Sequence, residues 1–243
     1  MIPEAKGMSE VMSEPPLFDF PIHNTILRFG GDAEERLEEL GIPLSVLHEA
    51  LTAGDVAARQ ATEDSPKTAA GLQRWMSTVQ NLRRGLRAEG WTLSDPANSP
   101  QIVSPSGIVS LAVVTGDAET GSTESGSEPR NLRPFGPTLA SAIEKNRTKQ
   151  VRGQLEITAV VEAALARTIS AYDGAPIQWV LMHHRSSDGK LRAEVSLPTS
   201  GEGRFIRRWR ERIVLPPLDF EGPTIPADSD LTSDDVDFDI LEA

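Results

Sequence analysis

The most informative pattern in this sequence is the side-chain alternation of residues 177–198, IQWVLMHHRSSDGKLRAEVSLP. It predicts both an antiparallel hairpin and the register of its two strands. Successive side chains of a strand point to opposite faces of a sheet. One strand face then carries Ile177, Trp179, Leu181 and His183, and the returning strand carries Leu191, Ala193, Val195 and Leu197. Both sets share a face only if the loop has an odd number of residues. We therefore predict a three-residue loop, 187–189, with Gly189 in the left-handed conformation.

This register also predicts the surroundings of individual side chains. Trp179 should lie in the core, and His183 should be a hydrogen-bonded core histidine. His184 should face the opposite, polar side near Arg192, so the two neighbouring histidines do not form a metal-binding pair. The following segment, 204–217, is interpreted as either a short helix leading into a strand or a continuous edge strand.

Helices are predicted in the N-terminal half. Residues 31–41 should form a short helix that Asp32 caps and Gly41 ends. Residues 43–63 should form a second helix, interrupted near Gly54.

Residues 65–91 give the clearest helical pattern. Ser65 is expected to cap this helix and Gly90 to end it. Trp75 should be a core residue on its apolar face. That face consists of side chains recurring every three or four residues: Ala69, Leu72, Trp75 or Met76, Val79, Leu82 and Leu86.

A second hairpin is predicted over residues 101–115. Its turn, Ser104-Pro105-Ser106-Gly107, has proline second and glycine fourth, as a type I turn prefers. Residues 108–115 are apolar at nearly every position, so both faces of that strand should be covered. Helices followed by a hairpin are similar in element order to a winged-helix arrangement.

These elements predict the α+β class, and they leave open whether the chain forms one domain or two. A helix-rich N-terminal half ends in a hairpin, a polar linker follows, and further helices over 136–150 and 154–174 precede the second antiparallel hairpin. The expected parts are a flexible N-terminal arm (1–24), a helical region plus hairpin (25–115), a linker or mobile loop (116–136), an α+β region (137–217) and a disordered acidic tail (218–243).

The net charge of −12 arises from the two ends of the sequence. Residues 218–243 hold nine acids and no base, and residues 25–217 are balanced, with 23 acids and 23 bases. Whole-chain acidity therefore does not exclude nucleic-acid binding. The absence of cysteine excludes disulfides and thiolate chemistry, and we expect a cytoplasmic bacterial protein without a transmembrane segment.

Catalytic motifs give little signal. Phosphate-loop, HExxH, GxSxG and dinucleotide-binding patterns are absent. Residues 228–232, DSDLT, match a phosphotransferase signature only superficially, because the preceding residues cannot form a buried strand. Asp188 lies in a turn without the upstream acid that a nuclease requires. We expect no cofactor and no metal, and an enzyme of unrecognised type is only the third hypothesis.

Arginine clusters suggest binding instead. Guanidinium groups interleaved with aromatic rings suit phosphate contact and base stacking, although a solvated surface that balances nearby acids explains them too. The candidate nucleic-acid or partner contacts are Arg83, Arg84, Arg87, Lys145, Arg147, Lys149, Arg152, Arg204, Arg207, Arg208, Trp209, Arg210 and Arg212.

Two binding hypotheses follow from these clusters. The first is a non-catalytic accessory protein that binds DNA, RNA or a nucleoprotein machine. The alternative is a protein–protein adaptor or assembly subunit that binds no nucleic acid. The oligomeric state is left open.

The last ten residues, DDVDFDILEA, alternate acidic and apolar side chains. Charge steers such a segment to a basic groove, and apolar side chains then anchor it. This end resembles the acidic tails of bacterial single-stranded-DNA-binding proteins, which dock on partner proteins, but it lacks their final proline-phenylalanine dipeptide. The expected anchors are Val236, Phe238, Ile240 and Leu241, and their groove belongs either to a partner or to this chain, as autoinhibition. A mere solubility tail is the third interpretation.

Overall fold

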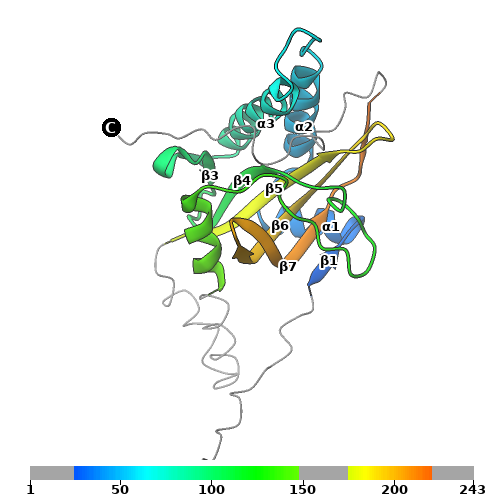
Figure 1. Ribbon diagram of the computed structural model, residues 1–243. Helices are drawn as coiled ribbons and strands as arrows, with labels where there is room; N and C mark the ends of the chain where they lie inside the picture. The colour runs from blue at the N-terminus through cyan, green and yellow to red at the C-terminus, as the bar shows by residue number, and fades with distance from the viewer. Residues whose placement is uncertain (1–24, 148–174, 221–243) are drawn as a thin grey trace, which may run out of the picture.

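One mixed β-sheet runs through the part of the chain that the computed structural model describes, residues 25–147 and 175–220 (Figure 1). The strand order is β1-β7-β6-β5-β4-β3-β2, and β8 pairs with β6. The strands are β1 (Ile26–Arg28), β2 (Thr92–Ser94), β3 (Gln101–Val103), β4 (Val109–Thr115), β5 (Ile177–Arg185), β6 (Lys190–Glu202), β7 (Phe205–Val214) and β8 (Leu218–Asp219).

Helices cover both faces of this sheet, which agrees with the predicted mixed class. On the first face lie α1 (Gly31–Glu39), α2 (Leu44–Ala58) and α3 (Ala69–Ala88). The helical segment 137–147 packs on the second face. Strand β5 is buried on both sides, because Trp179 and Leu181 enter the first core while Val180 and Met182 enter the second.

The register of the β5–β6 hairpin is confirmed. His183 lies opposite Ala193, and His184 lies opposite Arg192. The backbone N–H groups of Ser186 and Gly189 close the three-residue loop, and Gly189 has a φ of +84°. Side-chain alternation was sufficient here because one face is buried along both strands.

Parallel pairing between β4 and β5 joins the two halves of the chain. Seven consecutive residue pairs run from Val109↔Ile177 to Thr115↔His183. The hairpin β3–β4 is therefore part of the central sheet and not a wing beside a helical bundle. Residues 116–136 connect two parts of one body.

The helix boundaries differ from expectation in three places. Gly30 takes the N-cap position of α1, and Asp32 instead pairs with Arg28. Helix α3 begins at Ala69, because the side chain of Ser65 accepts a hydrogen bond from the Thr62 backbone.

The third difference is that α2 continues through Gly54. A Cβ atom built on Gly54 would lie 2.1 Å from Thr78 Oγ1 and 2.9 Å from the Arg74 carbonyl oxygen. This glycine therefore serves close packing of α2 on α3 rather than a break in the helix.

Residues 204–217 include the continuous strand β7, as one of the two interpretations proposed. It is an edge only up to Arg210, since β1 pairs in parallel with residues 211–213. The folded part also extends beyond residue 217, because β8 pairs with Lys190 and Leu191 of β6.

Both predicted core tryptophans pack in the first core, to different depths. Trp179 is 2% exposed. Trp75 is partly buried, and its Nε1 donates to the Val113 carbonyl oxygen at 3.0 Å. His183 is buried as predicted, but within the described residues neither of its ring nitrogens has a hydrogen-bond partner.

Three predicted segments lie outside the described residues: the arm 1–24, the helix 154–174 and the tail from residue 221 onward. Within the residues that are described, every helix is too short or too polar to cross a lipid bilayer.

We predict that Gly54→Ala destabilises the protein by about 1–3 kcal/mol, because the added methyl group overpacks the α2–α3 contact. Chemical denaturation measures the loss. Gly31→Ala in α1 is the matched control, since a Cβ atom there meets nothing within 4 Å. Equal stabilities for the two variants would contradict the close contact.

We also predict that His183 makes stability fall in mild acid. Burial, and secondarily the charges of Arg74 and His184, lower the His183 pKa from 6.5 to about 3. Between these values the unfolded chain binds a proton that the folded chain does not, so stability decreases as pH falls, by at most about 1.4 kcal/mol per unit. His183→Leu should flatten urea-unfolding stability between pH 6.5 and 4.5. An unchanged slope, equal to that of Met182→Leu, would contradict this assignment.

Candidate functional site

Two side chains of the arginine–aromatic segment in β7, Arg212 and Trp209, are buried. Arg212 forms a buried ion pair with Glu194, with Nη2–Oε2 at 2.6 Å and Nε–Oε1 at 3.1 Å. The two side chains are 2% and 0% exposed. Trp209 is also buried, and its Nε1 donates to the Pro129 carbonyl oxygen at 3.0 Å.

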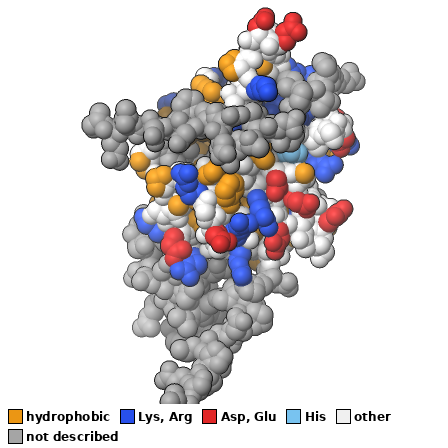
Figure 2. Space-filling model, viewed as in Figure 1, with side chains coloured by type: hydrophobic (Ala, Val, Ile, Leu, Met, Phe, Trp, Pro, Cys, Tyr) orange, Lys and Arg blue, Asp and Glu red, His pale blue; other side chains and the backbone are white. Residues whose placement is uncertain are grey.

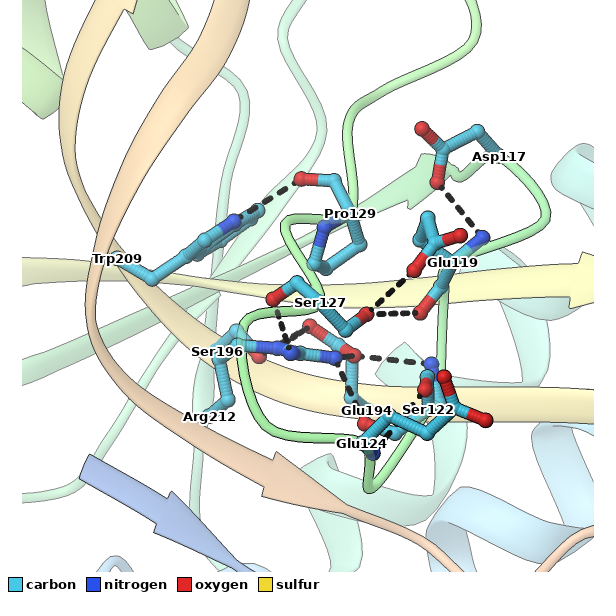
Figure 3. A network of polar contacts seen from close by, with 11 residues as sticks. Asp117, Glu119, Ser122, Glu124, Ser127, Pro129, Glu194, Ser196, Trp209 and Arg212 are labelled. Carbon is cyan, nitrogen blue, oxygen red and sulfur yellow. Dashed lines mark hydrogen bonds and ion pairs between the residues drawn. The ribbon is translucent and has the colours of Figure 1, made fainter. Parts of the chain in front are cut away.

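These two side chains hold the loop of residues 116–136 against the second face of the sheet (Figure 3). Arg212 donates to the backbone oxygens of Ser127 at 2.9 Å and Ser122 at 3.2 Å. Glu194 accepts the Gly121 N–H at 2.9 Å. We expected a linker or a mobile loop here, but the structure shows a loop that a buried ion pair anchors. Burial removes Arg212 and Trp209 from the side chains available to a ligand.

The other β7 arginines stay nearer the surface. Arg204 and Arg208 are exposed, and Arg210 is half-buried. Arg207 lies 3.7 Å from Glu202, a loose ion pair. Exposed pairs of this kind contribute little stability and are compatible with either a solvated surface or a ligand contact.

Helix 137–147 carries Lys145 and Arg147 on its exposed side. Hydrogen bonds between Arg147 and Glu144 raise the pKa of the arginine and lower that of the glutamate. Lys149 and Arg152 lie outside the described residues. Figure 2 shows acidic and basic side chains interleaved on the face it displays, as expected for a charge-balanced surface.

The arginines of α3 lie across the sheet from helix 137–147, because α3 packs into the first core and that helix into the second. Among the described residues, the basic side chains of these two helices therefore lie on opposite sides of the sheet. The α3 arginines line a groove with a volume of about 900 Å³. Its walls are Trp75, Met76, Val79, Gln80, Arg83, Arg84, Arg87 and Ala88 from α3, with Leu93 from β2 and Asp95 beyond it. We call this the α3 groove.

Its charges divide into a paired and an unpaired set. Arg83 forms a two-bond contact with Asp95, at 2.9 and 2.5 Å, which lowers the Asp95 pKa. Arg84 and Arg87 are exposed, and no carboxylate among the described residues pairs with either. Arg84 does donate to the Asn81 side-chain oxygen at 3.2 Å. Two guanidinium groups one helical turn apart therefore face solvent at this groove.

Apolar side chains accompany these charges. Met76 is 55% exposed and Leu93 is 47% exposed. The sequence pattern placed Leu72 and either Trp75 or Met76 on the core-facing stripe. Leu72 and Met76 are exposed, and the stripe is covered at Trp75, Val79, Leu82 and Leu86. The pattern thus found the basic half of the groove and missed its apolar half, which depends on where β2 runs.

The sequence did not predict a second charged cluster, which is centred on Asp55. Asp55 of α2, 1% exposed, accepts from Arg59 at 2.9 Å and Arg185 at 3.1 Å, and Arg74 lies 3.6 Å away. Phe220 stacks against the guanidinium groups of Arg59 and Arg185. The cluster ties α2, α3, β5 and β8 together, so we assign it a structural role. Among the described residues, no group of three or more His, Cys, Asp or Glu side chains is arranged to hold a metal ion.

Comparisons with protein-family profiles, with curated proteins and with solved structures found no match, so the functional argument rests on the groove itself.

We predict that Arg212→Met destabilises the protein by about 3–5 kcal/mol, because it leaves Glu194 buried and unpaired. Urea unfolding measures this loss. Arg208→Met makes the same chemical change at an exposed position of the same strand and should stay within about 0.5 kcal/mol of the parent. Adding Glu194→Gln to Arg212→Met should recover part of the loss. Equal effects of the two arginine substitutions would show that the buried pair does not anchor the loop.

Proposed function

We propose that this protein is a non-catalytic adaptor that binds an acidic, apolar segment of a partner protein in the α3 groove. The observation that carries the proposal is the pair of exposed guanidinium groups, Arg84 and Arg87, beside exposed Met76 and Leu93. Arginine binds carboxylates through two parallel hydrogen bonds. Methionine adapts its shape to varied apolar side chains. As before, we take the protein to be bacterial and cytoplasmic.

The character of the groove favours a peptide over a nucleic acid. Base stacking requires accessible aromatic rings. Trp209 is buried, and Trp75, the aromatic side chain that lines the groove, is only partly exposed. The most exposed large apolar side chains of the groove are Met76 and Leu93, which suit aliphatic or aromatic peptide side chains better than bases.

Nucleic-acid binding is the second candidate. The same exposed guanidinium groups of Arg84 and Arg87 can contact phosphate oxygens. The exposed bases of β7 and helix 137–147 would add electrostatic attraction that falls with salt. In this candidate the protein is an accessory factor of a nucleoprotein machine.

A random-peptide selection on the full-length chain tests the first candidate. We expect enriched peptides to combine several acids with large apolar residues. Arg84→Glu/Arg87→Glu should weaken their binding about 10- to 100-fold, because each lost ion pair becomes a repulsive contact. Fluorescence anisotropy of labelled peptides measures the change.

The matched control is Lys67→Glu/Lys145→Glu, which changes the net charge equally at exposed positions away from the groove. Peptides that bind both double variants equally well would contradict the proposal. In parallel, single-stranded DNA and RNA oligonucleotides are titrated at low and moderate salt. Salt-dependent binding that the groove variant loses and the control variant only weakens, without enriched peptides, would replace the first candidate with the second.

A further inference from the structure

We infer that the α3 groove is occupied in the resting protein by residues 234–241 of the same chain, DDVDFDIL. This inference rests on the proposed function, since it takes the groove to be the surface that binds the partner. The tail would compete with the partner for that surface. A partner segment would then have to displace the tail.

Charge complementarity is the first argument. Three arginines and one aspartate line the groove, which gives it a net charge of +2. The segment 234–241 carries four aspartates and no base. Arg84 and Arg87 are the lining groups that lack a carboxylate among the described residues, and the tail supplies carboxylates. By contrast, Arg147 and Arg207 already face Glu144 and Glu202.

The apolar pattern is the second argument. In an extended segment, Val236, Phe238 and Ile240 point to one side and the intervening aspartates to the other. The groove likewise has both apolar and charged parts. Its exposed apolar side chains are Met76 and Leu93, and its exposed charges are Arg84 and Arg87. A tail that only kept the protein soluble would need no such division.

Dimensions agree with this assignment. From Met76 to Arg87, α3 rises by about 16 Å at ~1.5 Å per residue. An extended chain covers that length with about five residues at ~3.3 Å each. The core of the tail, residues 236–241, therefore matches the length of the groove.

The tail can also reach the groove. The last described residue, Phe220, stacks on Arg59 and Arg185 beside Asp55, and Arg74 of α3 lies 3.6 Å from that same carboxylate. Phe220 is thus close to the N-terminal half of α3. Residues 221–233 span up to about 43 Å when extended, which exceeds the ~30 Å length of the 20-residue helix.

Tethering makes even weak docking effective. A segment on a short flexible linker has an effective concentration on the order of 1 mM. With an intrinsic Kd on the order of 0.1 mM, about 90% of the molecules would be docked. A partner segment would then bind roughly tenfold more weakly than it binds an open groove.

Paramagnetic relaxation in the full-length chain tests the inference. The chain has no cysteine, so Ala243→Cys accepts a single nitroxide label. We expect the label to attenuate the backbone amide signals of residues 76–88 and of Leu93, while signals from helix 137–147, on the other side of the sheet, persist. Arg84→Glu/Arg87→Glu should reduce the docked fraction to about half or less. Lys67→Glu/Lys145→Glu should leave the attenuation unchanged.

Exchanging the charges of the groove and the tail should restore docking. Adding Asp237→Arg/Asp239→Arg to the groove variant should restore attenuation of the same amides. Absence of selective attenuation in the parent, or equal attenuation in both double variants, would overturn docking of the tail. This result would leave the proposed function untouched. The proposed function fails if the selected peptides bind equally well whether or not Arg84 and Arg87 are replaced.

Discussion

Parallel pairing of β4 with β5 holds the two halves of the chain in one sheet and thereby determines where the helices pack. It joins Val109–Thr115 to Ile177–Arg185, so residues before and after the intervening loop and helix share one sheet. Because β5 is buried on both faces, helices must cover both sides. Asn146 secures the second side: its amide donates to the backbone oxygens of Gln178 and Pro198 at 2.8 and 2.9 Å, across β5 and β6. A parallel connection cannot be a tight turn, which explains why so much chain lies between the two strands.

This sheet also decides what α3 can bind. Leu82 and Leu86 fix the second half of the helix in the first core, and Trp75 bonds to the backbone of β4. Gly54 draws α2 against the other side of α3. With these contacts made, Met76, Arg84 and Arg87 are left at the surface beside β2. The groove therefore follows from core packing, and Asp95, which follows β2, completes its wall.

Local patterns in the sequence predicted the elements well and their mutual placement poorly. Alternation fixed the β5–β6 register, because both strands bury one face and lie close in sequence. Gly54 was misinterpreted as a break, since only the partner helix reveals a close approach. The inward turn of Arg212 depends on Glu194, a partner on a neighbouring strand, and Trp209 depends on the loop that covers it. Likewise, the arginines of the α3 groove were visible as a cluster, but their apolar neighbour Leu93 was not.

Occupation of the α3 groove by an acidic, apolar segment can be observed by methyl NMR of the five methionines. Met76 lines the groove, and Met182 is fully buried in the second core as an internal reference. Phe238 carries a ring whose local field shifts any methyl group that it contacts. If the tail occupies the groove, Phe238→Ala in the full-length chain should move the Met76 methyl signal and leave that of Met182 in place. A Met76 signal that does not move would show that Phe238 does not lie in the groove.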